Sequence, residues 1–485
     1  MGDEGRASNS ELPSSASQSA EQAKLFVIGP PPHPEAMLLD RPYRELRMPL
    51  QRLEKTRFNR WKRSLQAVGL IPLPSHRRVQ RLLEGFRPEV VVSVMQGTPF
   101  ISVAARTARA FGVPLVLIVH DLNEEFERVF PWAKRALFGK NREVYRAASR
   151  RLCVSPEMAE YLEKRYGVPG EVMYPNRSEE LLPRAAELSL ALRTAADQKT
   201  KSRKDQEPSG ARQREAQPRA NQETYGSQAG DFDSDHFDIL KDSSLVTRHS
   251  SQASASLTLG YAGSLAYGYG EELMRLIDVF RATGTRIRLF SPRPTGRLAA
   301  LNDAQDVVEV CGYRPALEAW REIQQTCDAV ILPYANPAGE QEMLYRTHFP
   351  SKLTEYLALG MPVIVSGPGL ATGVRWALGE MREARGKRQE AGDGKENFER
   401  GHFDILKRSP NGAIPCTSRQ ELVAVLQGLR EDGALREELA RRAVEAGKRD
   451  FDPVAIRVRF WEILRGSGEA VNEKLKAETG APEAL

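Results

Sequence analysis

The sequence predicts an α/β protein with two doubly wound, Rossmann-like domains and long disordered insertions. Short apolar strands, such as EVVVSVM at 89–95 and AVIL at 329–332, alternate with helical stretches. Strands that are apolar on both faces are typical of parallel sheets covered by helices. The alternation stops at a polar stretch, residues 183–256, and then restarts. A structureless loop of this length is rare inside one domain, so we interpret it as a disordered linker between two domains.

The composition is that of a globular protein without an obvious polyanionic partner. The chain has 485 residues, with 70 basic and 64 acidic side chains and a net charge of +6. This balance gives no reason to expect nucleic acid as a partner. Four cysteines lie far apart, and no apolar run approaches the ~20 residues needed to cross a bilayer. We therefore expect a cytoplasmic protein, or one peripheral to the inner face of the membrane.

The N-terminal domain is expected over residues 23–182, after a disordered tail at 1–22. Its expected strands are 24–29, 89–95, 114–119 and 151–154, and its expected helices are 76–86, 99–111, 141–148 and 156–166.

Residues 41–70 of this domain are interpreted as basic and helical. Between 41 and 87 there are thirteen Lys or Arg and three Glu, with apolar residues interleaved. Two interpretations stay open for this region: a solvated helical face, or contact with an anionic membrane.

The C-terminal domain is expected over 257–465, followed by a tail at 466–485. Within it, residues 382–410 form a second polar insertion, and both insertions contain the peptide HFDILK, at 236–241 and 402–407. The repeat is either a duplicated element without chemistry or a short docking peptide. The expected strands are 257–262, 286–290, 307–310, 329–332, 362–365 and 412–415, and the expected helices are 271–282, 296–302, 316–325, one starting at 350, 419–429, 434–448 and 453–465. Arg286 and Arg288 are interpreted as solvated charges on a strand face.

The stretch THFPSKLTEYLALGMPVIVSG at 347–367 is the most informative part of this domain. Pro350 fixes φ where a helix can begin, and Gly360 suits its end. Ser351 and Lys352 lie in the first turn of this helix. Free N–H groups and the helix dipole favour an anion there, so a phosphate can be held without a metal.

Two such domains, the second with YAGSL, CGYRPALEAWREIQQTCDAVILPY and FPSKLTEYLALGMPVIVSG, resemble glycosyltransferases of the GT-B architecture. The closest resemblance is to family 4, whose members are retaining and use nucleotide sugars. It covers 24–182 and 257–465 and is most specific in the second half. It implies transfer of a sugar from a nucleotide-diphosphate sugar to a hydroxyl of a glycan or lipid-linked acceptor. No cofactor and no metal are expected, and the seven histidines show no metal-binding spacing.

The resemblance assigns donor-binding roles to the stretch at 347–367. Glu355 matches the second Glu of the family's Glu–seven residues–Glu pattern and is expected to accept hydrogen bonds from the ribose hydroxyls. Thr347 stands where the first Glu is expected, so Thr347 or His348 is expected to take over contacts with the sugar. The Lys352 side chain and the N–H groups around Ser351 to Leu353 are expected to face the diphosphate.

Glycine-rich loops after strands complete the expected donor site. Gly263, Ser264 and Gly268 follow the first strand of the second domain, and Gly29 follows that of the first. Family members commonly have Arg and Lys where this chain has Ser264 and Tyr269.

The expected catalytic groups are two cations and one imidazole. Lys352 and Arg293 are the expected cations for the diphosphate. His120 ends a buried strand at the edge where ligands bind in open α/β folds, and the resemblance places it near the transferred sugar.

Two other functions remain open from the sequence. A nucleotide-sugar epimerase or a phosphorylase can use the same architecture. A non-catalytic nucleotide-sugar-binding scaffold is compatible with the missing first Glu and with the long insertions. Donor isomerisation, or donor binding without turnover, would distinguish these from a transferase.

Overall fold

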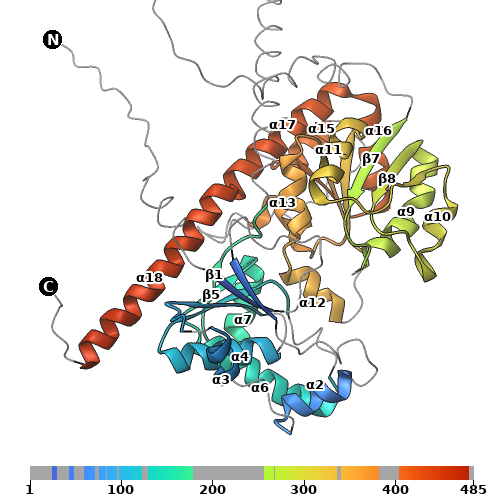
Figure 1. Ribbon diagram of the computed structural model, residues 1–485. Helices are drawn as coiled ribbons and strands as arrows, with labels where there is room; N and C mark the ends of the chain where they lie inside the picture. The colour runs from blue at the N-terminus through green and yellow to red at the C-terminus, as the bar shows by residue number, and fades with distance from the viewer. Residues whose placement is uncertain are drawn as a thin grey trace, which may run out of the picture.

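The computed structural model describes residues 25–29, 43–47, 59–70, 76–83, 85–95, 98–122, 129–177, 256–266, 268–335, 340–381 and 403–479. The expected tail at 1–22, nearly all of the linker at 183–256 with its HFDILK copy, residues 382–402 and the last six residues lie outside these ranges. The described residues form two α/β domains with parallel sheets (Figure 1), which confirms the predicted fold class.

The C-terminal domain contains a six-stranded parallel sheet in the order β12-β11-β10-β7-β8-β9. The chain starts in the middle at β7, moves outward through β8 and β9, and returns to β10 on the other side of β7. The carboxyl ends of β7 and β10 therefore form the topological switch point, where open α/β sheets bind ligands. The strands are β7 (Leu257–Ala262), β8 (Thr285–Phe290), β9 (Val308–Val310), β10 (Ala329–Pro333), β11 (Val363–Ser366) and β12 (Ala413–Cys416).

Most helices of this domain lie where the sequence predicts them. Two short helices were missed, α12 (Glu340–Thr347) and α14 (Thr372–Ala377). The second HFDILK copy is not structureless, because it contributes to helix α15 (Phe403–Arg408), whose Leu406 carbonyl accepts a hydrogen bond from Arg442. The others are α9 (Tyr269–Thr283), a 3-10 turn η6 (Gly296–Leu298), α10 (Ala300–Asp303), α11 (Ala316–Thr326), α13 (Ser351–Ala358), α16 (Arg419–Glu431), α17 (Gly433–Asp450) and α18 (Pro453–Thr479). Helix α18 thus continues through most of the expected tail.

The N-terminal domain contains a four-stranded parallel sheet in the order β3-β4-β5-β6. A second, two-stranded sheet pairs β1 (Leu25–Gly29) with β2 (Tyr43–Arg47) in parallel. The prediction of a helix over 41–70 is therefore wrong at β2 and correct at α2 (Asn59–Ala67), while residues 48–58 lie outside the described ranges. The remaining elements are α3 (His76–Leu82), β3 (Val91–Val94), α4 (Thr98–Phe111), β4 (Leu115–Val119), α6 (Pro131–Ala147), β5 (Arg150–Cys153), α7 (Pro156–Tyr166) and β6 (Glu171–Val172).

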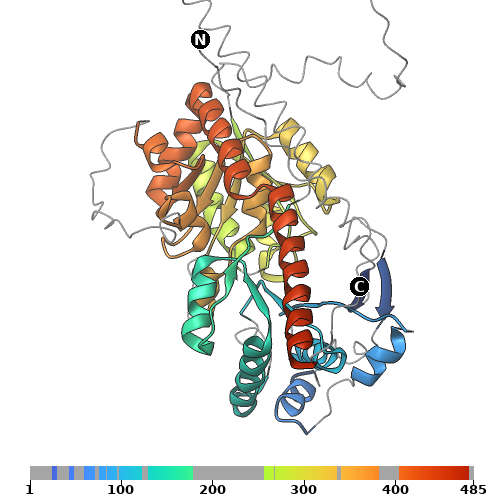
Figure 2. The ribbon, with the colours of Figure 1, turned by 90° about the vertical axis from the view of Figure 1, so that its left-hand side faces the viewer.

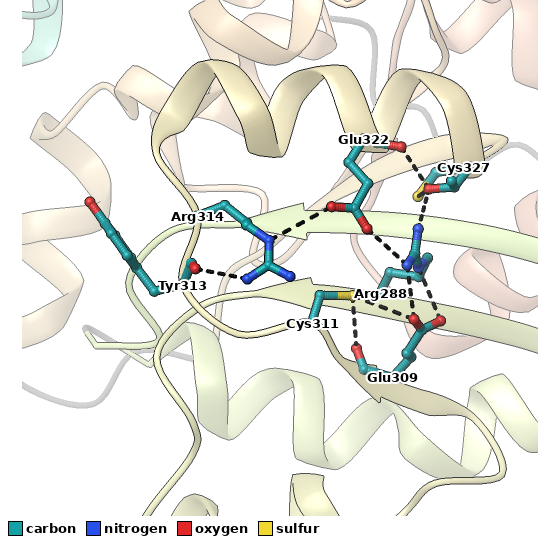
Figure 3. Close-up of polar contacts among 8 residues, drawn as sticks. Arg288, Glu309, Cys311, Tyr313, Arg314, Glu322 and Cys327 are labelled. Atoms are coloured by element: carbon teal, nitrogen blue, oxygen red, sulfur yellow. Dashed lines mark hydrogen bonds and ion pairs between the residues drawn. The ribbon is translucent and has the colours of Figure 1, made fainter.

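Arg288 is not the solvated charge that the sequence suggested. Its guanidinium binds both carboxylate oxygens of Glu309 at 2.8 and 3.0 Å and one oxygen of Glu322 at 3.0 Å, so that it ties β8 to β9 and α11 (Figure 3). Only 15% of the side chain is exposed. A hollow of about 320 Å³ beside it reaches Thr258 and Arg286, at the starts of β7 and β8. It therefore lies at the opposite edge of the sheet from the switch point.

The two domains share one continuous core. Four aromatic rings pack at the junction, with Tyr174 4.9 Å from Phe349 and 5.0 Å from Phe451, and Trp376 5.3 Å from Phe451. Asn176 donates to the carbonyl of Pro453, at the start of α18. Helix α18 extends from this junction past the N-terminal domain in both views (Figure 2). Among the described residues, no helix is long and apolar enough to cross a membrane.

Candidate donor site

The site forms where helix α13 starts beside the switch point of the C-terminal sheet. Gly263 directly follows β7 and has φ of 115°, a conformation that favours glycine. Lys352, in the first turn of α13, crosses directly over it, because a Cβ at Gly263 would lie only 2.7 Å from Cε of Lys352. Tyr356, one turn further along α13, accepts a hydrogen bond from the N–H of Ala262 at 3.2 Å. The strand end and the helix start are thereby held together.

Tyrosine rings surround the Lys352 ammonium group. Its Nζ lies 4.6 Å from the ring centroid of Tyr269 and 5.6 Å from that of Tyr261, both within the range of cation–π attraction. Tyr334, which follows β10, packs 6.0 Å from Tyr269 and 5.2 Å from Tyr345. From the sequence, Tyr269 was expected only to replace a Lys that is common in the family. The structure brings a lysine from another helix onto that ring.

Glu355 and Lys352 lie in the same partly enclosed site. Burial raises the pKa of Glu355 to about 7, although the positive charge of Lys352 acts against this rise. Burial also lowers the pKa of Lys352, and Glu355 partly restores it. Glu355 has no hydrogen-bond partner within the described part of the chain. Its carboxyl group is therefore available to hydroxyl groups of a ligand.

The start of α13 offers fewer free N–H groups than the sequence suggested. Pro350 precedes the helix, and no side chain caps it. The N–H of Leu353 donates to the carbonyl of Pro350 at 3.0 Å, and its side chain is fully buried. The assignment of Leu353 to the diphosphate is therefore not supported, whereas Ser351 is exposed in the same turn.

The loop between β7 and α9 places Gly268 and Ser264 beside these groups. Gly268 precedes α9 with φ of 88°, and a Cβ there would lie 2.8 Å from the hydroxyl of Tyr345. The Ser264 hydroxyl is exposed and accepts from the N–H of Ala266 at 3.1 Å, which stabilises the turn. The packing of Tyr345 against the loop therefore requires glycine at position 268.

Thr347 does not present its hydroxyl to a ligand. The side chain is buried, and Oγ1 donates to the carbonyl of Met343 at 2.8 Å, the usual back-bond of threonine in a helix. Its carbonyl accepts a hydrogen bond from Ser155 of the N-terminal domain at 2.5 Å. The expected sugar contact by Thr347 is therefore not supported, and the residue joins the two domains instead.

His348 also reaches across to the N-terminal domain. Its Nδ1 lies 3.0 Å from the carbonyl oxygen of His120 and 3.1 Å from Oδ1 of Asp121. Both oxygens accept hydrogen bonds, so Nδ1 carries a proton and donates to them.

The same contact sets the charges of its two partners. Burial lowers the pKa of His120, and the opposing effect of Asp121 does not compensate. Burial alone would raise the pKa of Asp121, but the hydrogen bond from His348 and the two imidazoles lower it overall. His120 is therefore neutral and Asp121 ionised near neutral pH.

A second bridge between the domains lies further out. Arg375 of α14 binds Glu157 of α7 at 2.8 Å and Glu380 at 3.2 Å. In the described residues, this pair adds to the polar contacts across the domain boundary that Ser155–Thr347, Asp121–His348 and Asn176–Pro453 make. None of them was predicted, because each joins residues about 190 or more positions apart.

Two residues that the sequence assigned to the donor site are not part of this group of side chains. Arg293 follows β8 and is exposed, and in the described residues no hydrogen bond or ion pair joins it to Lys352 or Glu355. Gly29 ends β1, where it is paired with Arg47 on the two-stranded sheet. The described residues contain no group of three or more His, Cys, Asp or Glu arranged to hold a metal ion.

Comparison with known families identifies the N-terminal domain. Residues 16–176 match the family model described as the glycosyl transferase 4-like domain. This match confirms the resemblance to family-4 glycosyltransferases, although it falls on the half of the chain where the sequence motifs are less specific. The search of curated proteins found no match.

Two of the solved structures that resemble this chain come from Anabaena and Rickettsia africae. HepE of Anabaena, in complex with UDP and glucose, is 13% identical, with 88% of this chain and 86% of that chain covered and a TM-score of 0.48. A glycosyltransferase from Rickettsia africae is 9% identical over 88% and 85% of the two chains, with a TM-score of 0.46. Both scores are below 0.5, so the similarity to the family rests on residues 16–176 and the fold class on the two parallel sheets themselves.

Proposed function

We propose that the protein transfers a sugar from a nucleotide-diphosphate sugar to a hydroxyl group of a glycan or lipid-linked acceptor, with retention at the anomeric carbon. The observation that carries this proposal is the position of Lys352, held over Gly263 at the switch point with Glu355 beside it. A cation, a glycine approach and a carboxyl group meet where a nucleotide diphosphate binds in such folds.

The main energetic difficulty of the reaction is the negative charge that develops on the leaving diphosphate. Preoriented cations and N–H groups stabilise such a charge most effectively in a site that excludes water. Lys352 meets this requirement because its aliphatic chain is fixed over Gly263 and its ammonium group is fixed over Tyr269. The first turn of α13 adds the N–H of Ser351 and the positive end of the helix dipole.

Glu355 binds the nucleoside end of the donor in this scheme. Its ionised carboxylate accepts hydrogen bonds from both ribose hydroxyls. Because its pKa is raised to about 7 in the free protein, donor binding is expected to favour ionisation and release a proton below that pH.

The N-terminal domain closes the site from the acceptor side. The acceptor oxygen forms its bond to the anomeric carbon on the face from which the diphosphate leaves. The carbon–phosphate oxygen bond breaks, and the acceptor proton moves to the departing phosphate oxygen. We place His120, which is neutral and whose backbone carbonyl is bound by His348, on this side.

A two-stage assay tests the proposal. The melting temperature is first measured with UDP-, GDP- and ADP-sugars, because a ligand that binds only the native state raises it. The stabilising donor is then incubated with a panel of glycan and lipid-linked acceptors, and the product's anomeric configuration is read by proton NMR. We expect transfer with retention. Isomerised donor without transfer, or stabilisation without turnover on any acceptor, would contradict the proposal.

A further inference from the structure

Among the described residues, aromatic rings rather than hydrogen bonds hold the Lys352 ammonium group. In this part of the chain no oxygen accepts a hydrogen bond from it, and no carboxylate forms an ion pair with it. Its Nζ lies 4.6 Å from the ring centroid of Tyr269 and 5.6 Å from that of Tyr261. A ring face attracts a cation without neutralising it, as a carboxylate would. All three N–H donors of Lys352 are therefore available to an anion.

Glu355 lies on the same helix as Lys352 but does not replace the rings. Its negative charge partly restores the pKa of Lys352 against the effect of burial. Within the described structure, however, the two side chains do not approach to ion-pair distance. An ion pair would direct the N–H groups of Lys352 toward the carboxylate and away from a ligand. The ring contact instead leaves the two groups available to different parts of one ligand.

Two further tyrosines pack behind the Tyr269 ring and fix its position. Tyr334 packs 6.0 Å from it, and Tyr345 of α12 packs edge-on against Tyr334 at 5.2 Å. A Cβ at Gly268, directly before Tyr269, would lie 2.8 Å from the Tyr345 hydroxyl. Only 7% of Tyr269 is exposed. The ring face that meets Lys352 is therefore set by the packing of the surrounding elements and not by the lysine itself.

The ring at position 269 is a departure from the family that this chain resembles, in which lysine is common there. A lysine at this place would repel the ammonium group of Lys352, and repulsion between like charges lowers the pKa of both amines. The ring of Tyr269 has the opposite effect, because its face attracts the charged form of the amine. The lysine from α13 is thereby favoured in its charged form, against the effect of burial.

We propose that Tyr269 is a positioning residue for sugar transfer, whose ring holds the charged amine of Lys352 over the Gly263 turn, where the leaving diphosphate arrives. In this scheme Tyr269 acts through Lys352 and does not touch the donor. The four-carbon side chain of lysine is flexible, so a fixed ring beneath the amine keeps it where its N–H groups face the phosphate oxygens. The inference rests on the proposed function for the identity of the anion, whereas the contact between ring and amine does not depend on it.

Graded fluorination of the ring in the full chain tests the proposal. The variant Tyr269→Phe is compared with forms whose introduced ring carries one, two or three fluorine atoms, which withdraw charge from the ring face and change its shape little. Mass spectrometry measures the rate at which acetic anhydride labels Lys352 in the free protein, because only the neutral amine reacts. At pH 8 this rate should rise about three- to tenfold from the unfluorinated to the trifluorinated ring. With the stabilising donor, kcat/KM should fall in the same order, and its decline at alkaline pH should move to lower pH.

The matched control is the same fluorinated series at Phe280, a fully buried ring near the other end of α9. It should leave the labelling rate of Lys352 and kcat/KM unchanged, and every variant should keep a cooperative thermal transition. The proposal is overturned if the labelling rate does not change with fluorination at position 269, or if it changes equally in the control series. Graded labelling without any sugar transfer would contradict the proposed function alone, since the labelling requires neither donor nor acceptor.

Discussion

The two domains contribute to the candidate site in different ways. The C-terminal domain brings its own groups together, because Lys352, Gly263, Tyr269 and Glu355 meet at one sheet edge. The N-terminal domain contacts the other half at His120, whose backbone carbonyl is bound by His348. Yet the family match lies in the N-terminal domain. Similarity in sequence therefore marks the shared fold here, while the local geometry of side chains marks the chemistry.

This difference predicts that substitutions at the site in the C-terminal half lower turnover more than substitutions at the domain boundary do. Lys352→Ala should lower turnover by about 100-fold or more, because the leaving diphosphate loses its fixed cation. The melting temperature should change little, since burial already disfavours the Lys352 charge. Steady-state kinetics and a thermal scan measure both quantities.

Lys164→Ala is the control for this prediction. It removes a lysine from an exposed ion pair with Glu160 in the N-terminal domain and should leave turnover unchanged. If Lys352→Ala were as active as this control, the C-terminal half would not hold the reacting phosphates where we place them.

A variant at the boundary should have an intermediate effect. His348→Ala removes the hydrogen bond to Asp121 and to the His120 carbonyl, and we expect about a tenfold loss of kcat/KM. Small-angle scattering of the free protein should show a larger radius of gyration, which saturating donor should reduce.

Glu157→Gln serves as the matched control, because it weakens the outer bridge to Arg375 and retains the shape of the side chain. We expect a smaller kinetic effect from it. Equal losses in the two variants would mean that the bridges only hold the domains together and that His348 has no special role at the site.

The smallest expected effect concerns stability and pH. The folded-state pKa of Glu355 is about 7, above its ordinary value of 4.5, so the folded protein holds a proton that the unfolded chain loses in this window. Stability therefore falls as pH rises from about 4.5 to 7. Glu355→Gln removes this loss and should raise the free energy of unfolding at pH 8 by about 1–2 kcal/mol, with little change at pH 5.

Thermal unfolding at both pH values, with Glu318→Gln on an exposed position of α11 as control, measures this effect. An equal change at pH 5 and pH 8 would contradict the raised pKa. The donor should bind more weakly to the Glu355 variant at either pH, because an amide accepts less well from the ribose hydroxyls.

Local patterns were sufficient for much of the fold. Pro350 and Gly360 correctly delimit α13, and the apolar runs of both sheets predict nearly all their strands within one or two residues. Strand β2 was missed because its sequence, YRELR, has three charged side chains and no apolar run. Helix α12 was missed because EQEMLYRT carries a weak pattern and lacks a clear start signal.

The site was predictable only where it depends on neighbours in sequence. Lys352 and Glu355 follow from the helix that contains them. The contacts that Thr347 and His348 make could not be predicted in this way, because their partners Ser155, His120 and Asp121 belong to the other domain. Such contacts depend on how two separately folded sheets dock, and the local pattern carries no signal for that.

The position of the bridging residues has a thermodynamic consequence. Thr347 ends α12, and His348 follows in the short link to α13, so the contacts that join the domains are covalently continuous with the element that carries Lys352 and Glu355. Donor affinity and domain closure are then two sides of one coupling free energy. The factor by which domain closure raises the affinity for the donor equals the factor by which the bound donor raises the equilibrium constant for closure. A molecule that binds across the boundary only in the closed form would thus raise the affinity for the donor, and the donor would raise the affinity for that molecule by the same factor.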